Sequence, residues 1–144
     1  MILVSACLAG LNTRYDGTNC LQKRFKELVS KGKAIPVCPE HMGGLLSPRE
    51  PVELVGGDGS SLLKGEAKAV GRKTGLDYSD LFIKGSDEVL NIIKSKNIKK
   101  AILKDGSPSC GSTYIKRGNR KIKGIGVTTA VLLNNGIEVE NEKQ

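Results

Sequence analysis

The chain of 144 residues has few aromatic side chains, with no Trp, two Phe and three Tyr. Its core must therefore be packed mainly by Leu, Ile, Val and Ala. No apolar run approaches the roughly 18 residues that a membrane-spanning helix needs, and the short apolar stretch after Met1 has neither the basic flank nor the length of a secretion signal. We therefore expect a cytoplasmic protein with no membrane partner, in which thiols stay reduced.

Several familiar motifs are also missing. The sequence contains no Cys-x-x-Cys pair, no zinc-finger spacing, no Gly-Lys-Ser/Thr phosphate loop and no dinucleotide-binding Gly-x-Gly-x-x-Gly. A serine-hydrolase triad would have to use His41, the only histidine, and no nucleophile elbow accompanies it. These absences argue against thioredoxin-like, zinc-finger, nucleotide-binding and serine-hydrolase chemistry.

Acidic residues are outnumbered by basic ones, which gives a formal net charge of +8. The Lys and Arg residues are spread thinly except in residues 94–104 and 116–123. A solvated helix face and a basic hairpin explain these two clusters, and no aromatic residues interleave with them to stack on bases. We therefore do not expect nucleic acid as a partner, while an anionic small substrate stays open.

Short apolar runs alternate with stretches of helical periodicity, a pattern typical of a parallel β-sheet covered by helices. The predicted strands are residues 2–6, 34–37, 100–103 and 137–139, and the predicted helices lie between Leu21 and Gly32, over 78–97 and over 126–135. The length matches one domain. We therefore predict a single α/β domain over residues 1–144, with three layers and a mostly parallel, Rossmann-like sheet.

The remaining segments are expected to be less regular. They are an exposed loop over residues 38–50, a short hairpin formed by 52–55 and 61–64, a basic hairpin around Gly118 and a frayed tail over 140–144. Ser79 or Ser86 is expected to cap the long helix, and Gly85 makes a break in it possible.

Three of the four cysteines follow predicted strands. Cys7 comes after the first strand, Cys38 directly after the second and Cys110 shortly after the third. Ligands of open α/β sheets bind beyond the carboxyl ends of the strands, so these thiols are expected to converge. Three converging thiolates can hold a metal or an iron–sulfur cluster and leave one position open for substrate. Cys20 is expected to open a helix and to stay outside this group.

Polar residues close to these cysteines add candidate functions. Arg14 can bind an anion or a carbonyl group in a fixed geometry, and Asp16 can orient it. Glu40 lies two residues after Cys38, close enough to share a pocket and to transfer protons. Ser107 and Ser109 lie in a Gly- and Pro-containing loop before Cys110. Each feature also has a plain structural reading, as a buried thiol or an ordinary turn.

Taken together, three segments identify the sequence as similar to a known family. They are Ser5-Ala6-Cys7-Leu8 with Arg14-Tyr15-Asp16-Gly17; Val37-Cys38-Pro39-Glu40 with Gly44-Leu45 and Pro48-Arg49; and Leu103-Lys104 with Ser107-Pro108-Ser109-Cys110-Gly111. Their order, spacing and identities resemble the thiouracil desulfidase family, also known as domain of unknown function family 523. The resemblance covers nearly the whole chain.

The resemblance implies a [4Fe-4S] cluster on Cys7, Cys38 and Cys110, with the fourth iron free of protein ligands. The family removes sulfur from a thiolated nucleobase such as 2-thiouracil, or from a nucleoside, without redox chemistry and releases sulfide. Glu40 would transfer protons, and Ser107 or Ser109 would assist. Arg49 joins Arg14 and Asp16 as a candidate substrate-binding residue.

Two other classes of function use the same sequence differently. A structural metal site or a cysteine-based sulfur carrier would need the thiols but no hydrolysis, and it predicts a closed site or a persulfide. A basic binding module would need residues 116–123 and no cysteine. Neither the exact thiolated substrate nor the acceptor of the sulfide can be predicted from the sequence.

Overall fold

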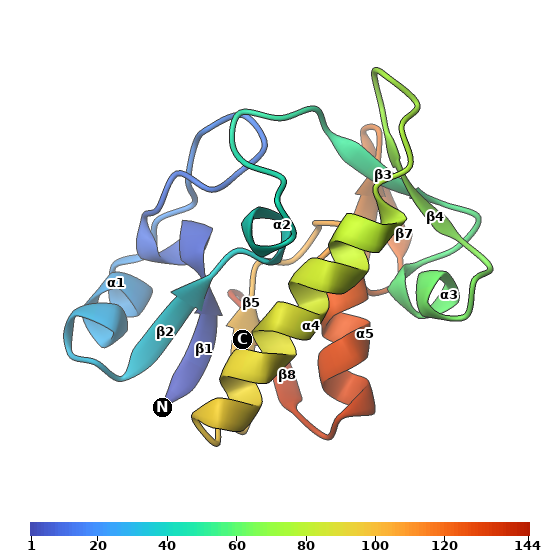
Figure 1. Ribbon diagram of the computed structural model, residues 1–144. Coiled ribbons are helices and arrows are strands. Elements are labelled where there is room, and N and C mark those ends of the chain that lie inside the picture. The colour runs from blue at the N-terminus through green and yellow to red at the C-terminus, as the bar shows by residue number, and fades with distance from the viewer.

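A computed structural model describes all residues, 1–144. Its centre is a four-stranded parallel sheet in the order β2-β1-β5-β8 (Figure 1). The strands are β1 (Ile2–Ser5), β2 (Ala34–Val37), β5 (Lys100–Leu103) and β8 (Glu138–Asn141). The predicted α/β class and parallel sheet are confirmed. Three of the four strands match their predicted positions to within one residue, and β8 extends two residues further than predicted.

Helices cover both faces of this sheet. On one face, α1 (Lys23–Ser30) packs Phe25 against Val4 and Ala34. On the other face, α4 (Ser79–Ser95) and α5 (Val127–Asn134) lie together over a core that contains Leu3 and Leu103. Neighbouring residues of β1 thus face opposite layers, as the pleat of a strand requires. The predicted three layers follow from this alternation.

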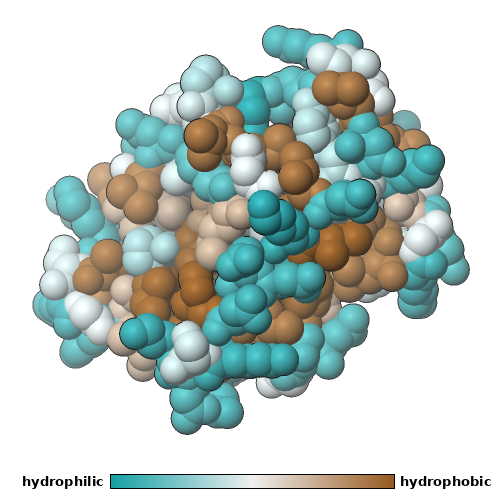
Figure 2. Space-filling view, in the orientation of Figure 1, coloured by the Kyte–Doolittle hydropathy of each residue, from teal (hydrophilic) through white to brown (hydrophobic).

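The long helix α4 is continuous and amphipathic. Hydrophilic residues run along it in the space-filling view, with hydrophobic residues on either side (Figure 2). Neither predicted cap is used. The cap position is Tyr78, Ser79 accepts a hydrogen bond from the backbone N–H of Ala69, and Ser86 is buried within the helix, where it bonds Thr128 Oγ1 at 2.7 Å. No helix in the structure combines the length and apolar character needed to cross a bilayer.

Gly85 permits a close helix crossing instead of breaking α4. A Cβ atom at Gly85 would lie 1.9 Å from the carbonyl oxygen of Pro39, and one at Gly43 would lie 2.2 Å from that of Leu81. These contacts bring α4 against α2 (Pro39–Met42), a short helix within the predicted loop 38–50. Pro39 suits the first helical position because its missing N–H has no partner to lose there. The close crossing fixes Glu40 within α2.

Outside the sheet, one predicted hairpin is confirmed and another is wrong. Strands β6 (Tyr114–Arg117) and β7 (Arg120–Lys123) form the basic hairpin. By contrast, β3 (Val52–Val55) pairs with β4 (Lys68–Gly71), and the expected second strand at 61–64 is largely helix α3 (Gly59–Leu63). The helix forms there because the Asp58 side chain caps it by accepting from the N–H of Ser61 at 3.2 Å.

The C-terminal tail is ordered, contrary to prediction. Glu140 and Asn141 belong to β8, and Glu142 is only 9% exposed. Glu142 accepts a hydrogen bond from the backbone N–H of Asp105 at 2.8 Å, and Arg24 donates to the Gln144 carbonyl at 3.4 Å. Long-range partners therefore fix a segment whose composition alone is typical of a frayed end.

Candidate functional site

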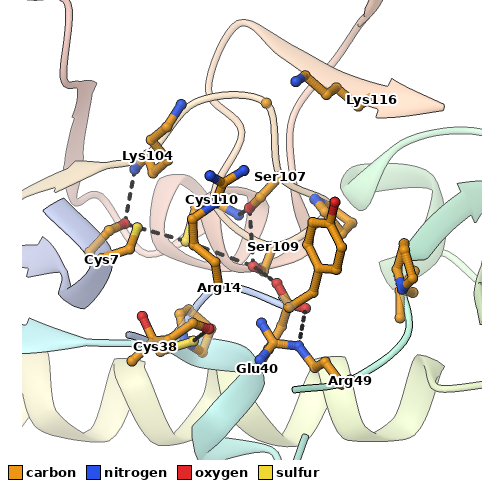
Figure 3. A pocket seen from close by; sticks show the side chains of 18 of the residues that line it. Cys7, Arg14, Cys38, Glu40, Arg49, Lys104, Ser107, Ser109, Cys110 and Lys116 are labelled. Atoms are coloured by element: carbon orange, nitrogen blue, oxygen red, sulfur yellow. Dashed lines mark hydrogen bonds and ion pairs between the residues drawn. The ribbon is translucent and has the colours of Figure 1, made fainter. Parts of the chain in front are cut away.

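The three candidate cysteines line one cavity of about 290 Å³ at the carboxyl edge of the sheet (Figure 3). Cys7 lies in η1 (Ala6–Ala9), a 3-10 helix that directly follows β1. Cys38 connects β2 to α2, and Cys110 lies in the loop after β5. Because β2, β1 and β5 are adjacent in the sheet, their carboxyl ends meet and bring the thiols together. The volume is close to the lower end of ordinary ligand sites, roughly 300 to 1,000 Å³.

The cysteines are all unbridged, and their environment disfavours bare thiolates. Burial raises the pKa of Cys7 to about 12, helped by the neighbouring charges of Cys110, Cys20 and Cys38. Burial likewise raises the pKa of Cys110 to about 12, and it raises the pKa of Cys38. Three thiolates could therefore coexist here at neutral pH only with a positively charged group bound between them.

Cys110 is the most tightly held of the three thiols. Its sulfur accepts a hydrogen bond from Ser5 Oγ at 3.5 Å, and Ser5 in turn accepts from the backbone N–H of Lys104 at 2.9 Å. Thr129 Oγ1 donates to the Cys110 carbonyl at 3.1 Å. The cysteine is thus connected to β1, to the end of β5 and to α5. The sequence could have indicated this role of Ser5, because Ser5 ends a strand two residues before Cys7.

The loop around Cys110 is closed by the buried carboxylate of Asp105. Four backbone N–H groups donate to its Oδ1 at 3.0 to 3.3 Å; they belong to Gly106, Ser112, Thr113 and Tyr114. Burial by itself would raise the pKa of Asp105, but the hydrogen bonds from Thr113, Ser112 and Tyr114 outweigh it and lower the pKa. An ionised Asp105 therefore fixes both ends of the loop that carries Cys110.

Glu40 stands at the end of a directed hydrogen-bond chain. Ser109 Oγ donates to Glu40 Oε2 at 2.8 Å, and Arg49 Nε donates to Oε1 at 3.2 Å. The Ser107 and Ser109 hydroxyls lie 3.2 Å apart, and the Cys110 N–H donates to Ser107 at 2.7 Å. Ser109 Oγ also lies 3.7 Å from Cys110 Sγ, but its contact with Glu40 is much shorter. Because the single proton of Ser109 is used on one of these acceptors, Ser107 donates to Ser109. Ser109, and not Ser107, is therefore the serine in contact with the carboxylate.

The predicted substrate-binding residues are placed differently from one another. Arg14 lines the cavity, and its guanidinium has no ion pair. Arg49 also lines it but is committed to Glu40. Asp16 is exposed outside the cavity, where its carboxylate accepts from the hydroxyl and the N–H of Thr18. The structure thus brings two of the three to the cavity.

Other cavity-lining residues were not predicted. Lys104 directly follows the third strand, and Lys116 comes from the β6–β7 hairpin. Both belong to the two basic clusters of the sequence, which were explained as a solvated helix face and a basic hairpin. Cys20 lies three residues before α1 instead of opening it. Its N–H donates to the Cys7 carbonyl at 2.9 Å, but it does not line the cavity.

Comparisons with known proteins agree on one family. The family model described as 2-thiouracil desulfurase matches residues 2–144. An uncharacterized protein of Bacillus subtilis (strain 168), YbbK, is 42% identical over 147 residues, which cover 100% of this chain and 97% of YbbK. A solved structure of the [4Fe-4S]-dependent thiouracil desulfidase TudS superposes with a TM-score of 0.86 and 38% identity, over 99% of this chain and 91% of that one.

Proposed function

Because the chain belongs to the 2-thiouracil desulfurase family, we propose that it converts the C=S group of a thiolated nucleobase to C=O and releases sulfide. One water molecule enters for each sulfur that leaves as hydrogen sulfide, so the reaction needs no external oxidant or reductant. The observation that carries the proposal is the meeting of three unbridged thiols and the Glu40–Ser109 pair in one cavity.

The donor set fits a [4Fe-4S] cluster held by Cys7, Cys38 and Cys110. Sulfur ligands suit iron–sulfur clusters, and the raised pKa values call for a cationic group between the thiols. When bound, a cluster with one iron free of protein ligands supplies a Lewis acid that polarises a C=S bond.

Glu40 is the proposed proton-transfer residue. Its side chain is 11% exposed, and its carboxylate accepts hydrogen bonds from Ser109 and Arg49, so both oxygens are held in defined directions. In this position Glu40 can take a proton from the water that adds to the thiocarbonyl carbon and return it to the departing sulfur. Ser109 keeps Glu40 oriented and can donate to an oxyanion when the carboxylate is protonated.

Substrate binding is assigned to the cations around the cavity. Arg14 has no ion pair and can donate to a nucleobase carbonyl or an anionic substituent. Arg49 contributes through Glu40, which it holds at 3.2 Å. Asp16 has no part in the proposed site because its carboxylate is turned to Thr18 outside the cavity.

The test is anaerobic reconstitution of the full chain with iron and sulfide, followed by addition of 2-thiouracil. Uracil and released sulfide are measured together with iron content and the visible absorption of the cluster. We expect equal amounts of uracil and sulfide from the wild type. Cys110→Ala should lose both cluster and turnover, while Cys20→Ala, the matched control outside the cavity, should keep both.

The outcomes separate the candidate functions. A protein that binds a cluster but accumulates a persulfide without forming uracil would be a sulfur carrier. A protein that binds iron yet turns over neither 2-thiouracil nor a panel of thiolated bases and nucleosides would hold a structural site. If no iron binds, the desulfidase proposal fails.

A further inference from the structure

The hydroxyl group of Ser47 joins three residues around the cavity without lining it. Ser47 Oγ donates to the backbone carbonyl of Arg14 at 2.6 Å and accepts from Arg49 Nη1 at 2.8 Å. It also lies 2.8 Å from Nε2 of His41, the only histidine of the chain. These partners come from three segments, namely the loop after η1, the end of α2 and the stretch that leads to β3.

The hydrogen count fixes the direction of each bond. A serine hydroxyl has one proton and can accept two hydrogen bonds. Its proton is used on the Arg14 carbonyl, which can only accept, and Arg49 can only donate. The remaining contact must therefore be a hydrogen bond donated by His41 Nε2, so the structure requires the imidazole to carry a proton on Nε2. All three capacities of the Ser47 hydroxyl are then satisfied.

The same hydroxyl controls both sides of the cavity. Arg49 donates to Glu40 through Nε and to Ser47 through Nη1. Ser47 therefore fixes the guanidinium that orients the Glu40 carboxylate. A second bond, from the Arg49 N–H to the Tyr15 carbonyl at 2.7 Å, joins the same two segments. The loop that carries Arg14 is therefore attached to the residue that holds Glu40.

We propose that Ser47, supported by His41, is a positioning residue that sets Arg14 for substrate binding and Arg49 for orienting Glu40. This inference rests on the proposed function, since the two arginines serve the substrate and the proton-transfer group. Ser47 itself touches neither the thiols nor the cavity. Its loss should therefore change kinetics while leaving cluster binding intact.

The first test needs neither activity nor a variant. Because His41 is the only histidine, the ¹⁵N spectrum of the full chain contains one imidazole, and its two nitrogens can be assigned directly. At pH 8, where an ordinary histidine is neutral, we expect a proton on Nε2 that exchanges slowly with water. Ser47→Ala should speed this exchange. A proton on Nδ1 alone in the wild type would overturn the inference.

The second test compares Ser47→Ala with Ser47→Thr, which keeps a hydroxyl, and with Ser30→Ala, a serine at the end of α1 far from the cavity. For Ser47→Ala we expect unchanged iron content, KM raised about fivefold and kcat/KM lowered roughly tenfold, the loss typical of one or two hydrogen bonds. Ser47→Thr should recover most of this. Equal kinetics for Ser47→Ala and Ser30→Ala would overturn the inference. If the wild type binds iron without turnover, the proposed function fails, and the imidazole spectrum alone decides the role of Ser47.

Discussion

Two loops that line the cavity are built in opposite ways. The Cys110 loop, residues 104–113, surrounds the buried Asp105 carboxylate and fixes Cys110 by bonds from Ser5 and Thr129. The Arg14 loop, residues 11–19, is mostly exposed, and its own carboxylate, Asp16, bonds only Thr18. The Cys110 loop thus forms a fixed wall of the cavity, held by the core. The Arg14 loop forms an open wall, attached mainly through Ser47 and Arg49.

This difference suggests a division of labour. A ligand for a cluster must be preorganised, and a loop closed on a buried carboxylate meets that need. A binding surface for substrate needs a free hydrogen-bond donor, and Arg14 supplies one on a less constrained loop. Substitutions in the Cys110 loop should therefore lower stability, substitutions in the Arg14 loop should change substrate binding, and Glu40 between them should govern the rate.

The largest effect is expected at Glu40. Glu40→Gln keeps the shape of the side chain but removes the base, so we expect kcat to fall by about 10² to 10⁴, the usual contribution of general acid–base catalysis. Iron content and the cluster spectrum should not change. Steady-state kinetics with 2-thiouracil and an iron assay on the same sample measure both quantities.

Glu53→Gln is the matched control for Glu40. Glu53 also lines the cavity, but it pairs with Arg72 at 3.4 Å and accepts from the Gly118 N–H, with no link to Ser109. A change in kcat below about threefold is expected. If Glu53→Gln were as inactive as Glu40→Gln, any cavity carboxylate would matter equally, and the assignment to Glu40 would fail.

The second largest effect is expected on stability, where the carboxylates of the two loops, Asp105 and Asp16, should differ. Asp105→Ala leaves four backbone N–H groups without their acceptor, so we expect the free energy of unfolding to fall by about 3 kcal/mol or more. Asp16→Ala, an exposed position, should change it by less than about 0.5 kcal/mol. Urea unfolding followed by circular dichroism measures both. Similar losses for the two variants would remove the distinction between the walls.

The pH dependence of stability gives an independent reading of Asp105. Its pKa is lowered in the folded protein, so its contribution is complete above the unfolded pKa of about 3.9 and disappears as the pH falls through the lower folded value. The urea midpoint of the wild type should therefore drop as the pH falls below about 4. Asp105→Asn should show a shallower drop, because it has no carboxylate to protonate. Identical slopes would assign the acid sensitivity to other groups.

Local pattern predicted the part of the site that depends on strand ends. The strands before Cys7, Cys38 and Cys110 were found from apolar runs, and the α/β rule then placed the thiols at one edge. The sequence could not show that β1 lies between β2 and β5, which is what makes these ends adjacent. The resemblance to the desulfidase family added the cluster and the role of Glu40, which residue patterns alone left open.

One error comes from contacts between distant parts of the chain, and another comes from a local side-chain cap. The tail was predicted to fray because it is polar, but Asp105 and Arg24 hold it from distant parts of the chain. Residues 61–64 were predicted as a strand, and the cap from Asp58 makes most of them helical. Ser47 drew no attention because its bond to the Arg14 carbonyl joins residues 33 positions apart, which only the fold brings together.

A smaller effect is expected at Arg14, on the open wall. Arg14→Met removes a guanidinium that has no ion pair, so folding stability should hardly change, while KM should rise about tenfold, as for loss of one charged hydrogen bond. Arg72→Met is the control, since that cation lines the cavity but pairs with Glu53. An Arg14 variant that lost stability instead of affinity would mean that the open wall is as constrained as the fixed one.

The smallest expected effect tests how far the tail contributes to the fixed wall. Glu142 pairs with Lys104 Nζ at 2.8 Å and accepts from the Asp105 N–H, and its side chain is only 7% exposed. Glu142→Gln can still accept from the Asp105 N–H but loses the charge that pairs with Lys104. We therefore expect the free energy of unfolding to fall by about 1 kcal/mol. Glu140→Gln breaks the corresponding but more exposed pair with Lys100 and should cost clearly less. Burial by itself would lower the pKa of Lys104, but the bond to Glu142 outweighs it and the pKa is raised. The difference in free energy of unfolding between the wild type and Glu142→Gln should therefore persist to high pH. It should vanish only above about pH 10.5, where the Lys104 ammonium loses its proton. Equal losses for the two variants would show that the tail stabilises the sheet edge in general and has no particular connection to the Cys110 loop.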